Sequence, residues 1–369
     1  MKRTGKILLI ALTTIIGVLL IGIIVLAVKS PGKLDPLKDT EGKVIVGSLV
    51  EKNFIEIGGL RQGFFIRGEN PENPVLLFLH GGPGSPELAY SIAYESSERL
   101  EKYFTVCYWD QRGAGMSFNN AIDDATMNVK QFVEDARQIT EYLQRRFNQE
   151  KIYLMGHSWG SYLGIKIIEK YPENYWAYIG IGQISNQLES EKLAYDYLLN
   201  LTALTNENKT FEKLKQFDKN ASDFPNNDYL MTSRGLLNKF GVGMAHQDIS
   251  MFTIIKNVML FKGYTLSEKK NYGKGTMFSL QLFDNAMNDN LFESSASFDV
   301  PVFFVQGIYD FVTSYALAKE YLDKLEAPQK AFFTFENAAH IPNLEEPEKF
   351  IQTVRQILQT VDTKQNLIE

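Results

Sequence analysis

Four short apolar runs constrain the fold of this chain more than any other feature of its sequence. Each run is six or seven residues long and is apolar at mostly consecutive positions rather than at alternate ones. Strands that are buried on both faces of a parallel sheet show this pattern. The runs are residues 75–80 (VLLFLH), 104–110 (FTVCYWD), 152–158 (IYLMGHS) and 301–307 (PVFFVQG).

Longer segments with helical periodicity separate these runs. Residues 127–147 repeat apolar side chains at the three- and four-residue spacing of one helix face. A further strand-like run, 331–336 (AFFTFE), precedes a helical segment over residues 345–360. This alternation predicts an α/β fold with a mostly parallel sheet and helices on both of its faces.

The alternation stops between residues 186 and 297. This segment is rich in Asn, Lys, Phe and Met, and it offers amphipathic helices without a core strand. We expect a helical cap inserted into the core. The predicted organisation is an N-terminal anchor (1–29), a tether (30–43), a first part of the core (44–185), the cap (186–297) and a second part of the core (298–369).

The N-terminal segment has the length of a membrane span. Residues 7–28 contain no charged side chain, and as a helix they would extend about 33 Å, close to the thickness of a bilayer's hydrocarbon core. A cleaved signal peptide has a shorter apolar region and a small-x-small cleavage site, whereas this run ends directly at Lys29. We therefore interpret it as an uncleaved single-pass anchor in the cell membrane. Lysine and arginine are balanced on its two sides, and the short basic start favours an extracytoplasmic catalytic domain.

Charge and cysteine content narrow the function classes. Cys107, the single cysteine, cannot form an internal disulfide or a thiolate zinc cage, and its position within 104–110 indicates a core thiol. The chain has a net charge of −6, and beyond residue 29 it has 34 basic and 44 acidic residues. Nucleic-acid binding requires clustered basic residues. We therefore expect no nucleic-acid partner, and we expect no metal or cofactor.

Residues 156–160 (GHSWG) match the G-x-S-x-G pattern of a nucleophilic serine on a sharp turn between a strand and a helix. The run 152–155 (IYLM) leads into the motif as a strand, and residues 162–170 continue from it as a helix. Gly156 and Gly160 allow the close backbone contacts that this turn needs. Ser158 is therefore the predicted nucleophile.

A serine hydroxyl needs a histidine base, which in turn needs an acid to orient it. His340 follows the last predicted strand, where a loop at the carboxyl edge of the sheet would present it. We expect His157 to point away from the nucleophile and His246 to lie in the cap, away from the strand ends. Asp310 follows the run 301–307 and is the predicted partner of His340.

Backbone N–H groups must stabilise the oxyanion that forms during acyl transfer. One predicted donor is the amide of Trp159, which follows the nucleophile. The other should come from the glycine-rich loop after the run 75–80, and we assign it to Gly82. This loop, HGGPG, comprises His80, Gly81, Gly82, Pro83 and Gly84.

Three motifs together resemble the proline iminopeptidase-like branch of the α/β-hydrolases: HGGPG at 80–84, WDQRGAGMS at 109–117 and GHSWG at 156–160. The resemblance covers residues 44–185 and the chain from 300 onward, but not the cap. It implies the α/β-hydrolase fold and an aminopeptidase that releases an N-terminal residue, often proline, from short peptides. Ser158, Asp310 and His340 would form the triad, and Asp110 and Arg112 would form an internal pair that holds their loop.

Two departures from this branch bear on specificity. Position 311, directly after the predicted triad acid, is Phe, and the cap contains no tryptophan. The cap offers several acids for a substrate ammonium group without singling one out: Glu189, Glu191, Glu207, Glu212 and Asp248. Two other functions therefore stay open, hydrolysis of a different small ester or amide and a catalytically silent binding module at the cell surface. The sequence does not indicate an oligomeric state.

Overall fold

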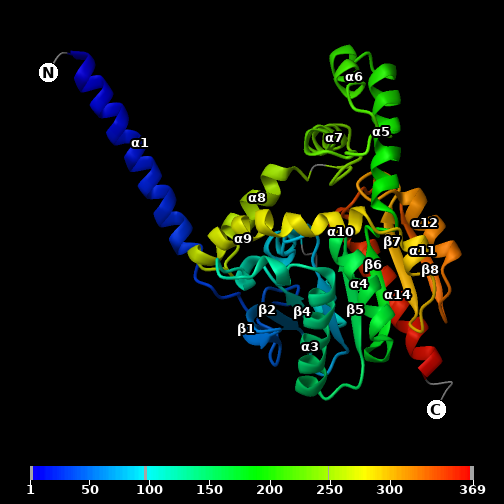
Figure 1. Cartoon of the computed structure of the whole chain (residues 1–369). Helices are drawn as coiled ribbons and strands as arrows, with labels where there is room; N and C mark the ends of the chain where they lie inside the picture. The colour runs from blue at the N-terminus through cyan, green and yellow to red at the C-terminus, as the bar shows by residue number, and fades with distance from the viewer. Residues whose placement is uncertain (1–2, 95–97, 248, 366–369) are drawn as a thin grey trace.

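The computed structural model describes residues 3–94, 98–247 and 249–365, in which eight strands form one sheet (Figure 1). The strand order is β1-β2-β4-β3-β5-β6-β7-β8. β1, β2 and β4 pair antiparallel, and the other neighbours pair parallel, which confirms the predicted mostly parallel sheet. The strands are β1 (Leu49–Ile57), β2 (Leu60–Gly68), β3 (Val75–Leu79), β4 (Thr105–Trp109), β5 (Ile152–His157), β6 (Tyr175–Ile181), β7 (Val302–Gly307) and β8 (Lys330–Phe335).

Alternate side chains of the central strands enter two apolar cores on opposite faces of the sheet. Leu77 and Leu154 pack on one face, and Leu76 and Met155 pack on the other. The first core is covered by α3 (Val129–Phe147), α4 (Trp159–Lys170) and α12 (Tyr315–Lys324), and the second by α14 (Pro347–Gln365). Two short helices, α2 (Leu88–Ser91) and α13 (Pro342–Glu345), lie in loops at the carboxyl edge of the sheet.

Between β6 and β7 the described chain forms helices and their connecting turns. These helices are α5 (Gln187–Leu204), α6 (Asn208–Leu214), α7 (Asn227–Lys239), α8 (Met251–Leu260), α9 (Leu266–Ser279), α10 (Phe283–Met287) and α11 (Leu291–Ser294). They extend over the edge of the sheet at which β5 and β7 end (Figure 1). We keep the name cap for residues 186–297.

α1 (Arg3–Val28) projects away from the rest of the molecule (Figure 1). Its segment Gly5–Val28 has a mean hydropathy of 3.0 and is not buried by the protein. Among the described helices it is the one that is long and apolar enough to cross a membrane.

The segment that follows α1 is packed against the protein and does not form a free tether. Leu34 and Leu37 within it are buried, and Pro31 forms a β-bridge with Thr265 at the start of α9. Leu34 packs in the same apolar cluster as Phe261 and Tyr264 of the cap, and this contact holds the first part of the segment against the cap.

One buried ammonium group joins the end of α1 to the cap. The Nζ atom of Lys269 donates hydrogen bonds to the carbonyl oxygens of Lys29, at 2.9 Å, and Met259, at 2.7 Å. Burial lowers the pKa of Lys269. Its hydrogen bonds satisfy carbonyl groups at the C-terminal ends of α1 and α8, where helices leave them without intrahelical partners.

The expected pair between Asp110 and Arg112 is not formed. Arg112 instead makes a two-pronged ion pair with Asp135 of α3, with N–O distances of 2.7 and 3.0 Å. Both side chains are almost fully buried, and Gln62 of β2 donates a further bond to Asp135 at 2.7 Å. This pair connects the loop after β4 to α3 and to the edge of the sheet.

Asp110 points in the opposite direction, toward the cap. Its carboxylate accepts hydrogen bonds from the Tyr264 hydroxyl at 2.7 Å and from the Met116 backbone N–H at 2.8 Å. Burial raises the pKa of Asp110 to about 7 despite these two donors. The structural role that we expected of Asp110 and Arg112 is thus divided between two different partners.

The buried pair makes a prediction about stability. We expect Arg112→Ala to lower the free energy of unfolding by about 3–5 kcal/mol, because Asp135 would stay buried without its counter-ion. Chemical denaturation in detergent would measure this loss. Arg145→Ala is the matched control, because Arg145 is exposed on α3 and lies 3.9 Å from Glu141; we expect a change of no more than about 0.5 kcal/mol there. Equal losses in the two variants would contradict the prediction.

Candidate active site

Ser158 lies on a sharp turn between β5 and α4, as the sequence predicts for a nucleophile elbow. Its backbone has φ 53° and ψ −118°, a conformation that residues with a side chain rarely adopt. The neighbouring His157, Trp159 and Gly160 are buried, whereas Ser158 is partly exposed. The turn therefore presents this serine at the surface of an otherwise packed segment.

The two motif glycines permit this turn because a Cβ atom would not fit at either position. A Cβ on Gly156 would lie 2.2 Å from the Gly160 carbonyl oxygen, and one on Gly160 would lie 2.1 Å from the Leu79 oxygen in β3. The elbow is thus held by close backbone packing between β5, α4 and β3.

Asp310 and His340 are brought together from the loops after β7 and β8. The Nδ1 atom of His340 lies 2.9 Å from Oδ2 of Asp310, and both side chains are buried. The carboxylate accepts further hydrogen bonds from four donors: the backbone N–H groups of Val312 and Thr313, the Thr313 hydroxyl and the Gln306 amide. These donors fix the orientation of Asp310, which in turn orients the imidazole.

Ser158 and His340 both lie against the backbone at the end of β6. The N–H of Ser158 donates to the Ile181 carbonyl at 2.9 Å. The next residue, Gly182, has φ 54°, and a Cβ there would lie 3.0 Å from the His340 ring. The backbone at the end of β6 therefore contacts both the serine turn and the imidazole, and among the described residues no hydrogen bond joins the Ser158 hydroxyl to His340.

The HGGPG loop packs beside the serine. A Cβ on Gly81 would lie 3.2 Å from the Ser158 Cβ, so the loop backbone directly contacts the elbow. Gly82 has φ 114°, which favours glycine. In the described part of the chain, the backbone N–H groups of Gly82 and Trp159 have no hydrogen-bond partner.

Gln111 connects the three sequence motifs and was not among the predicted residues. Its side chain accepts a hydrogen bond from the Trp159 indole at 3.2 Å and donates one to the His80 carbonyl at 3.1 Å. Its backbone N–H donates to Nε2 of His80 at 3.2 Å. Burial lowers the pKa of His80 to about 4, so this imidazole is neutral and accepts that bond.

A second histidine and an unpredicted acid lie directly behind His340. The His157 ring lies 5.0 Å from the His340 ring between centroids. Its Nδ1 is 2.7 Å from the Glu87 carboxylate, and its Nε2 is 3.0 Å from the His340 carbonyl oxygen. Both partners are hydrogen-bond acceptors, so each ring nitrogen of His157 must carry a proton to bond to them. The ring is therefore a positively charged imidazolium.

The pKa shifts of this pair agree with the geometry. Burial alone would lower the pKa of His157, but the charge and hydrogen bond of the Glu87 carboxylate raise it by more, so the pKa of His157 is raised overall. Burial alone would raise the pKa of Glu87, but the charge and hydrogen bond of the His157 imidazolium lower it by more, so the pKa of Glu87 is lowered overall. No sequence pattern around Glu87 indicates this role, because its partner is 70 residues away.

His246 lies in the cap as expected, but the prediction that it lies away from the strand ends is wrong. Its ring stacks on Tyr309, in the loop that carries Asp310, with 3.6 Å between centroids. The backbone N–H of Phe311 donates to the Val242 carbonyl of the same cap segment at 3.1 Å. The cap thus reaches the strand ends and contacts the acid loop.

Glu191 is the one buried acid among the described cap residues; Asp248 lies outside them. Glu191 forms a two-pronged ion pair with Arg234 of α7, one contact of which is 3.0 Å. It also accepts a bond from the Gln187 amide at 2.9 Å. Its charge is therefore already neutralised within the cap.

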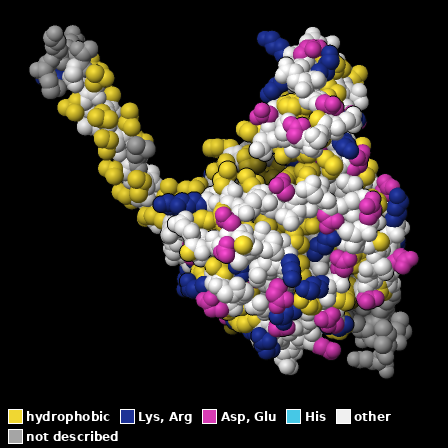
Figure 2. Space-filling model, in the orientation of Figure 1, with side chains coloured by type: hydrophobic (Ala, Val, Ile, Leu, Met, Phe, Trp, Pro, Cys, Tyr) yellow, Lys and Arg dark blue, Asp and Glu magenta, His cyan; other side chains and the backbone are white. Residues whose placement is uncertain are grey.

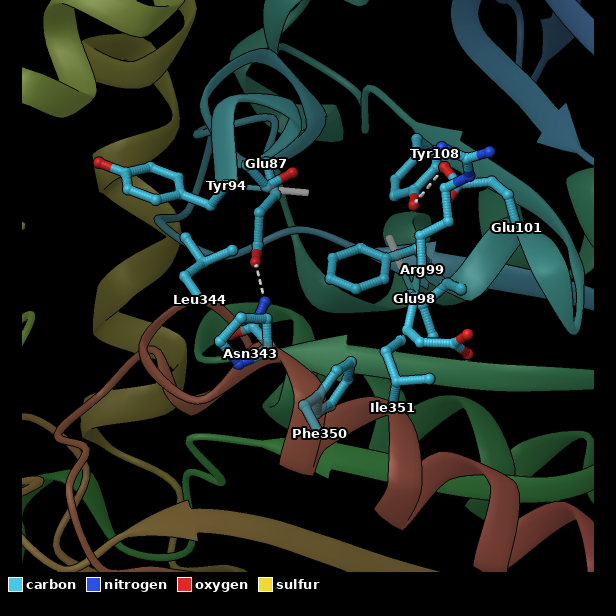
Figure 3. A pocket seen from close by; sticks show the side chains of 14 residues that line it. Glu87, Tyr94, Glu98, Arg99, Glu101, Tyr108, Asn343, Leu344, Phe350 and Ile351 are labelled. Carbon is cyan, nitrogen blue, oxygen red and sulfur yellow. Dashed lines mark hydrogen bonds between the residues drawn. The ribbon is translucent and has the colours of Figure 1, made fainter. Parts of the chain in front are cut away.

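A pocket adjoins the Glu87 side of the site (Figure 3). At this end of the pocket, the Glu87 carboxylate accepts a hydrogen bond from the Asn343 amide at 2.9 Å. Tyr94 and Leu344 also line this end. Ser158, Asp310 and His340 do not line it. Within the described residues, no group of three or more His, Cys, Asp and Glu side chains is arranged to hold a metal ion.

Comparison with known proteins identifies a family and several relatives of this chain. Residues 74–347 match the family described as alpha/beta hydrolase fold. A Bacillus subtilis protein named "Probable aminopeptidase YbaC" is 33% identical over 306 residues, covering 81% of this chain and 93% of the relative. The proline iminopeptidase of Heyndrickxia coagulans is 24% identical over 310 residues, covering 84% of this chain and 99% of the relative.

The fold also matches solved structures. A crystal structure of a bacterial membrane phospholipase A superposes with a TM-score of 0.61 at 17% identity, covering 98% of this chain and 99% of that one. At this identity the likeness concerns the fold alone.

The Glu87–His157 pair makes a prediction about pH. The lowered pKa of Glu87 stabilises the fold above about pH 4.5, and the raised pKa of His157 stabilises it below about pH 6.5. We expect the difference in unfolding free energy between the wild type and Glu87→Gln to be largest between these values. It should shrink above them, as His157 loses its proton at its raised pKa, and below them, as Glu87 is protonated. Denaturation curves from pH 4 to 9 would test this, and a difference independent of pH would contradict it.

Proposed function

The chain belongs to the α/β-hydrolase fold family, and from this premise we propose that it is a serine hydrolase with Ser158, His340 and Asp310 as its catalytic triad. The observation that carries the proposal is the hydrogen bond of 2.9 Å between His340 and Asp310. The strained turn of Ser158 packs on the same end of β6 as this imidazole. The proposal requires the Ser158 hydroxyl to come within hydrogen-bond reach of His340 when substrate is bound.

In the proposed reaction, Ser158 attacks the substrate carbonyl while His340 accepts its proton. Asp310 holds the imidazole in the required orientation and stabilises its positive charge. The backbone N–H groups of Gly82 and Trp159 donate to the developing oxyanion, and their lack of other partners in the described chain supports this role. His340 then protonates the leaving group, and water releases the acyl group by the same steps.

We propose that the substrates are short peptides from which the N-terminal residue is released. The support for this substrate class is the relationship to YbaC over most of both chains, together with the proline iminopeptidase named above. We further propose that α1 anchors the hydrolase to the cell membrane as a single span, with the catalytic domain on the extracytoplasmic side. The length and apolar composition of α1 support the anchor.

A specific observation favours hydrolysis of a different acyl substrate as the second candidate. The buried cap acid, Glu191, is neutralised by Arg234, and Phe311 next to Asp310 stacks on Tyr197 of α5 with 4.0 Å between ring centroids. An apolar contact therefore occupies the position directly after the proposed triad acid, and the buried cap acid is already paired. An ester or amide without a free amine would fit this arrangement.

Removal of the nucleophile tests the proposed chemistry. We expect Ser158→Ala to lower turnover by about a millionfold, as for other activated serines, and to abolish labelling by a fluorophosphonate probe. Melting temperature would verify that the variant is folded. Activity above a tenth of the wild-type value would overturn the assignment, and failure of the folded wild type to react with the probe would favour the silent binding module.

A pair of substrates separates the two candidate activities. An aminopeptidase should release coumarin from prolyl- or alanyl-aminomethylcoumarin at least about a hundredfold faster than from the N-acetylated compounds, since the free ammonium is the group it must recognise. Comparison of kcat/KM values would measure this. Faster hydrolysis of short acyl esters, with no preference for a free amine, would instead identify the second candidate.

A further inference from the structure

The cap carries most of the large exposed apolar side chains that the structure describes outside α1. Seven of them lie between residues 251 and 280, on α8, on α9 and, in one case, directly after α9. Figure 2 shows apolar side chains gathered between α1 and the cap, in continuity with those of α1. The seven are Met251, Phe252, Ile255, Leu260, Leu266, Met277 and Leu280, which we call the α8–α9 surface.

α8 is apolar on its outer face as well as on its inner face. Ile254 and Val258 are buried in the cap, whereas Phe252 and Ile255 are 75% and 54% exposed. A helix on the surface of a soluble protein normally places polar residues on its outer face. A contiguous exposed apolar patch of this kind marks a surface that contacts something else.

The exposed charges on the same two helices are positive. Lys256, Lys270 and Lys274 are exposed and have no carboxylate partner among the described residues. Glu268, the one acid between residues 249 and 280, is occupied by an ion pair of 2.6 Å with Lys52. This excess of lysine contrasts with the net charge of −6 of the chain.

The α8–α9 surface also adjoins the point at which α1 ends. Lys269 of α9 binds the carbonyl oxygens of both Lys29, one residue after α1, and Met259 in the last turn of α8. The bridge between Pro31 and Thr265 fixes the start of α9 to the same place. A bilayer that contains α1 would therefore end beside these two helices.

We propose that the α8–α9 surface docks on the lipid bilayer that α1 spans, with Phe252 and Ile255 at the boundary between acyl chains and head groups and the lysines at anionic head groups. Apolar side chains beside lysines are the composition of helices that lie in a membrane interface. The proposal rests on the proposed anchoring by α1. A second copy of the chain fits the surface less well, because a two-fold contact would bring the unpaired lysines of both copies together.

Single-cysteine labelling of the full-length chain would test this. Cys107 is fully buried and should not react in the folded protein, so an introduced cysteine can carry an environment-sensitive fluorophore. Phe252→Cys reports on the α8–α9 surface and Val18→Cys on the middle of α1. Glu150→Cys, exposed in the loop before β5 at the opposite edge of the sheet, is the control. Each labelled variant would be reconstituted in vesicles of phosphatidylcholine and phosphatidylglycerol that contain nitroxide-labelled lipid.

We expect the labels at positions 252 and 18 to be quenched at least threefold more than the label at position 150. In the triple variant Lys256→Gln, Lys270→Gln, Lys274→Gln, quenching at position 252 should fall in the anionic vesicles and change little in pure phosphatidylcholine. Circular dichroism would verify that each variant is folded.

The outcomes distinguish docking from anchoring. Quenching at position 18 without quenching at position 252 would overturn the docking and leave the anchor in place, whereas lack of quenching at both positions would overturn both. A blue shift at position 252 that grows with protein density but is insensitive to nitroxide lipid would identify a second copy as the occupant and overturn the proposal. None of these outcomes depends on which substrate the hydrolase cleaves.

Discussion

The serine turn depends on two places where the backbone leaves no room for a Cβ atom. Gly156 and Gly160 let β5, α4 and the end of β3 approach one another within the space that a methyl group would occupy. This close packing holds Ser158 at positive φ, and the same approach brings the HGGPG loop onto the serine. The strain at one residue is stabilised by the packing of three elements around it, which is the usual way in which a functional site keeps an unfavourable backbone conformation.

The buried charged side chains in and around the site are stabilised by different kinds of partner. Asp310 is surrounded by five hydrogen-bond donors, and Glu87 faces an imidazolium that also holds the backbone of His340. Arg112 and Asp135 form a closed pair that connects a loop to α3. In each case the cost of burying a charge is offset by several specific partners, and the partners come from different segments of the chain.

The sequence predicts the parts of this molecule that depend on local pattern. The runs that became β3, β4, β5 and β7 are apolar on both faces, so their burial can be read directly from the residues. The run that became β8 is correctly predicted as a strand, but it lies at the edge of the sheet and is only partly buried. β1 and β2 lie outside these predictions because β1 is only partly buried and mixes charged with apolar residues. β6 (YWAYIGI) is fully internal to the sheet, yet it follows α4 so closely that its apolar residues read as part of the preceding segment.

Predictions failed where a partner is set by the tertiary fold. Asp110 and Arg112 are close in sequence, but one side chain faces the cap and the other faces α3, so proximity along the chain misled the assignment. The contact between His246 and Tyr309 depends on how the cap folds back on the core, which no local spacing encodes. Glu87 and Gln111 form hydrogen bonds with residues tens of positions away, so only the folded structure identifies their roles.

The contacts at the two ends of α9 have a consequence for the position of the candidate active site relative to α1. α9 begins beside the end of α1 and ends on the glycine loop, where Thr276 donates to the Gly84 carbonyl at 2.8 Å. One helix of 14 residues thus extends from the end of α1 to the HGGPG loop. If α1 spans the bilayer as proposed, α9 sets the distance between the bilayer surface and the candidate active site, and a substrate would have to reach the site at that distance.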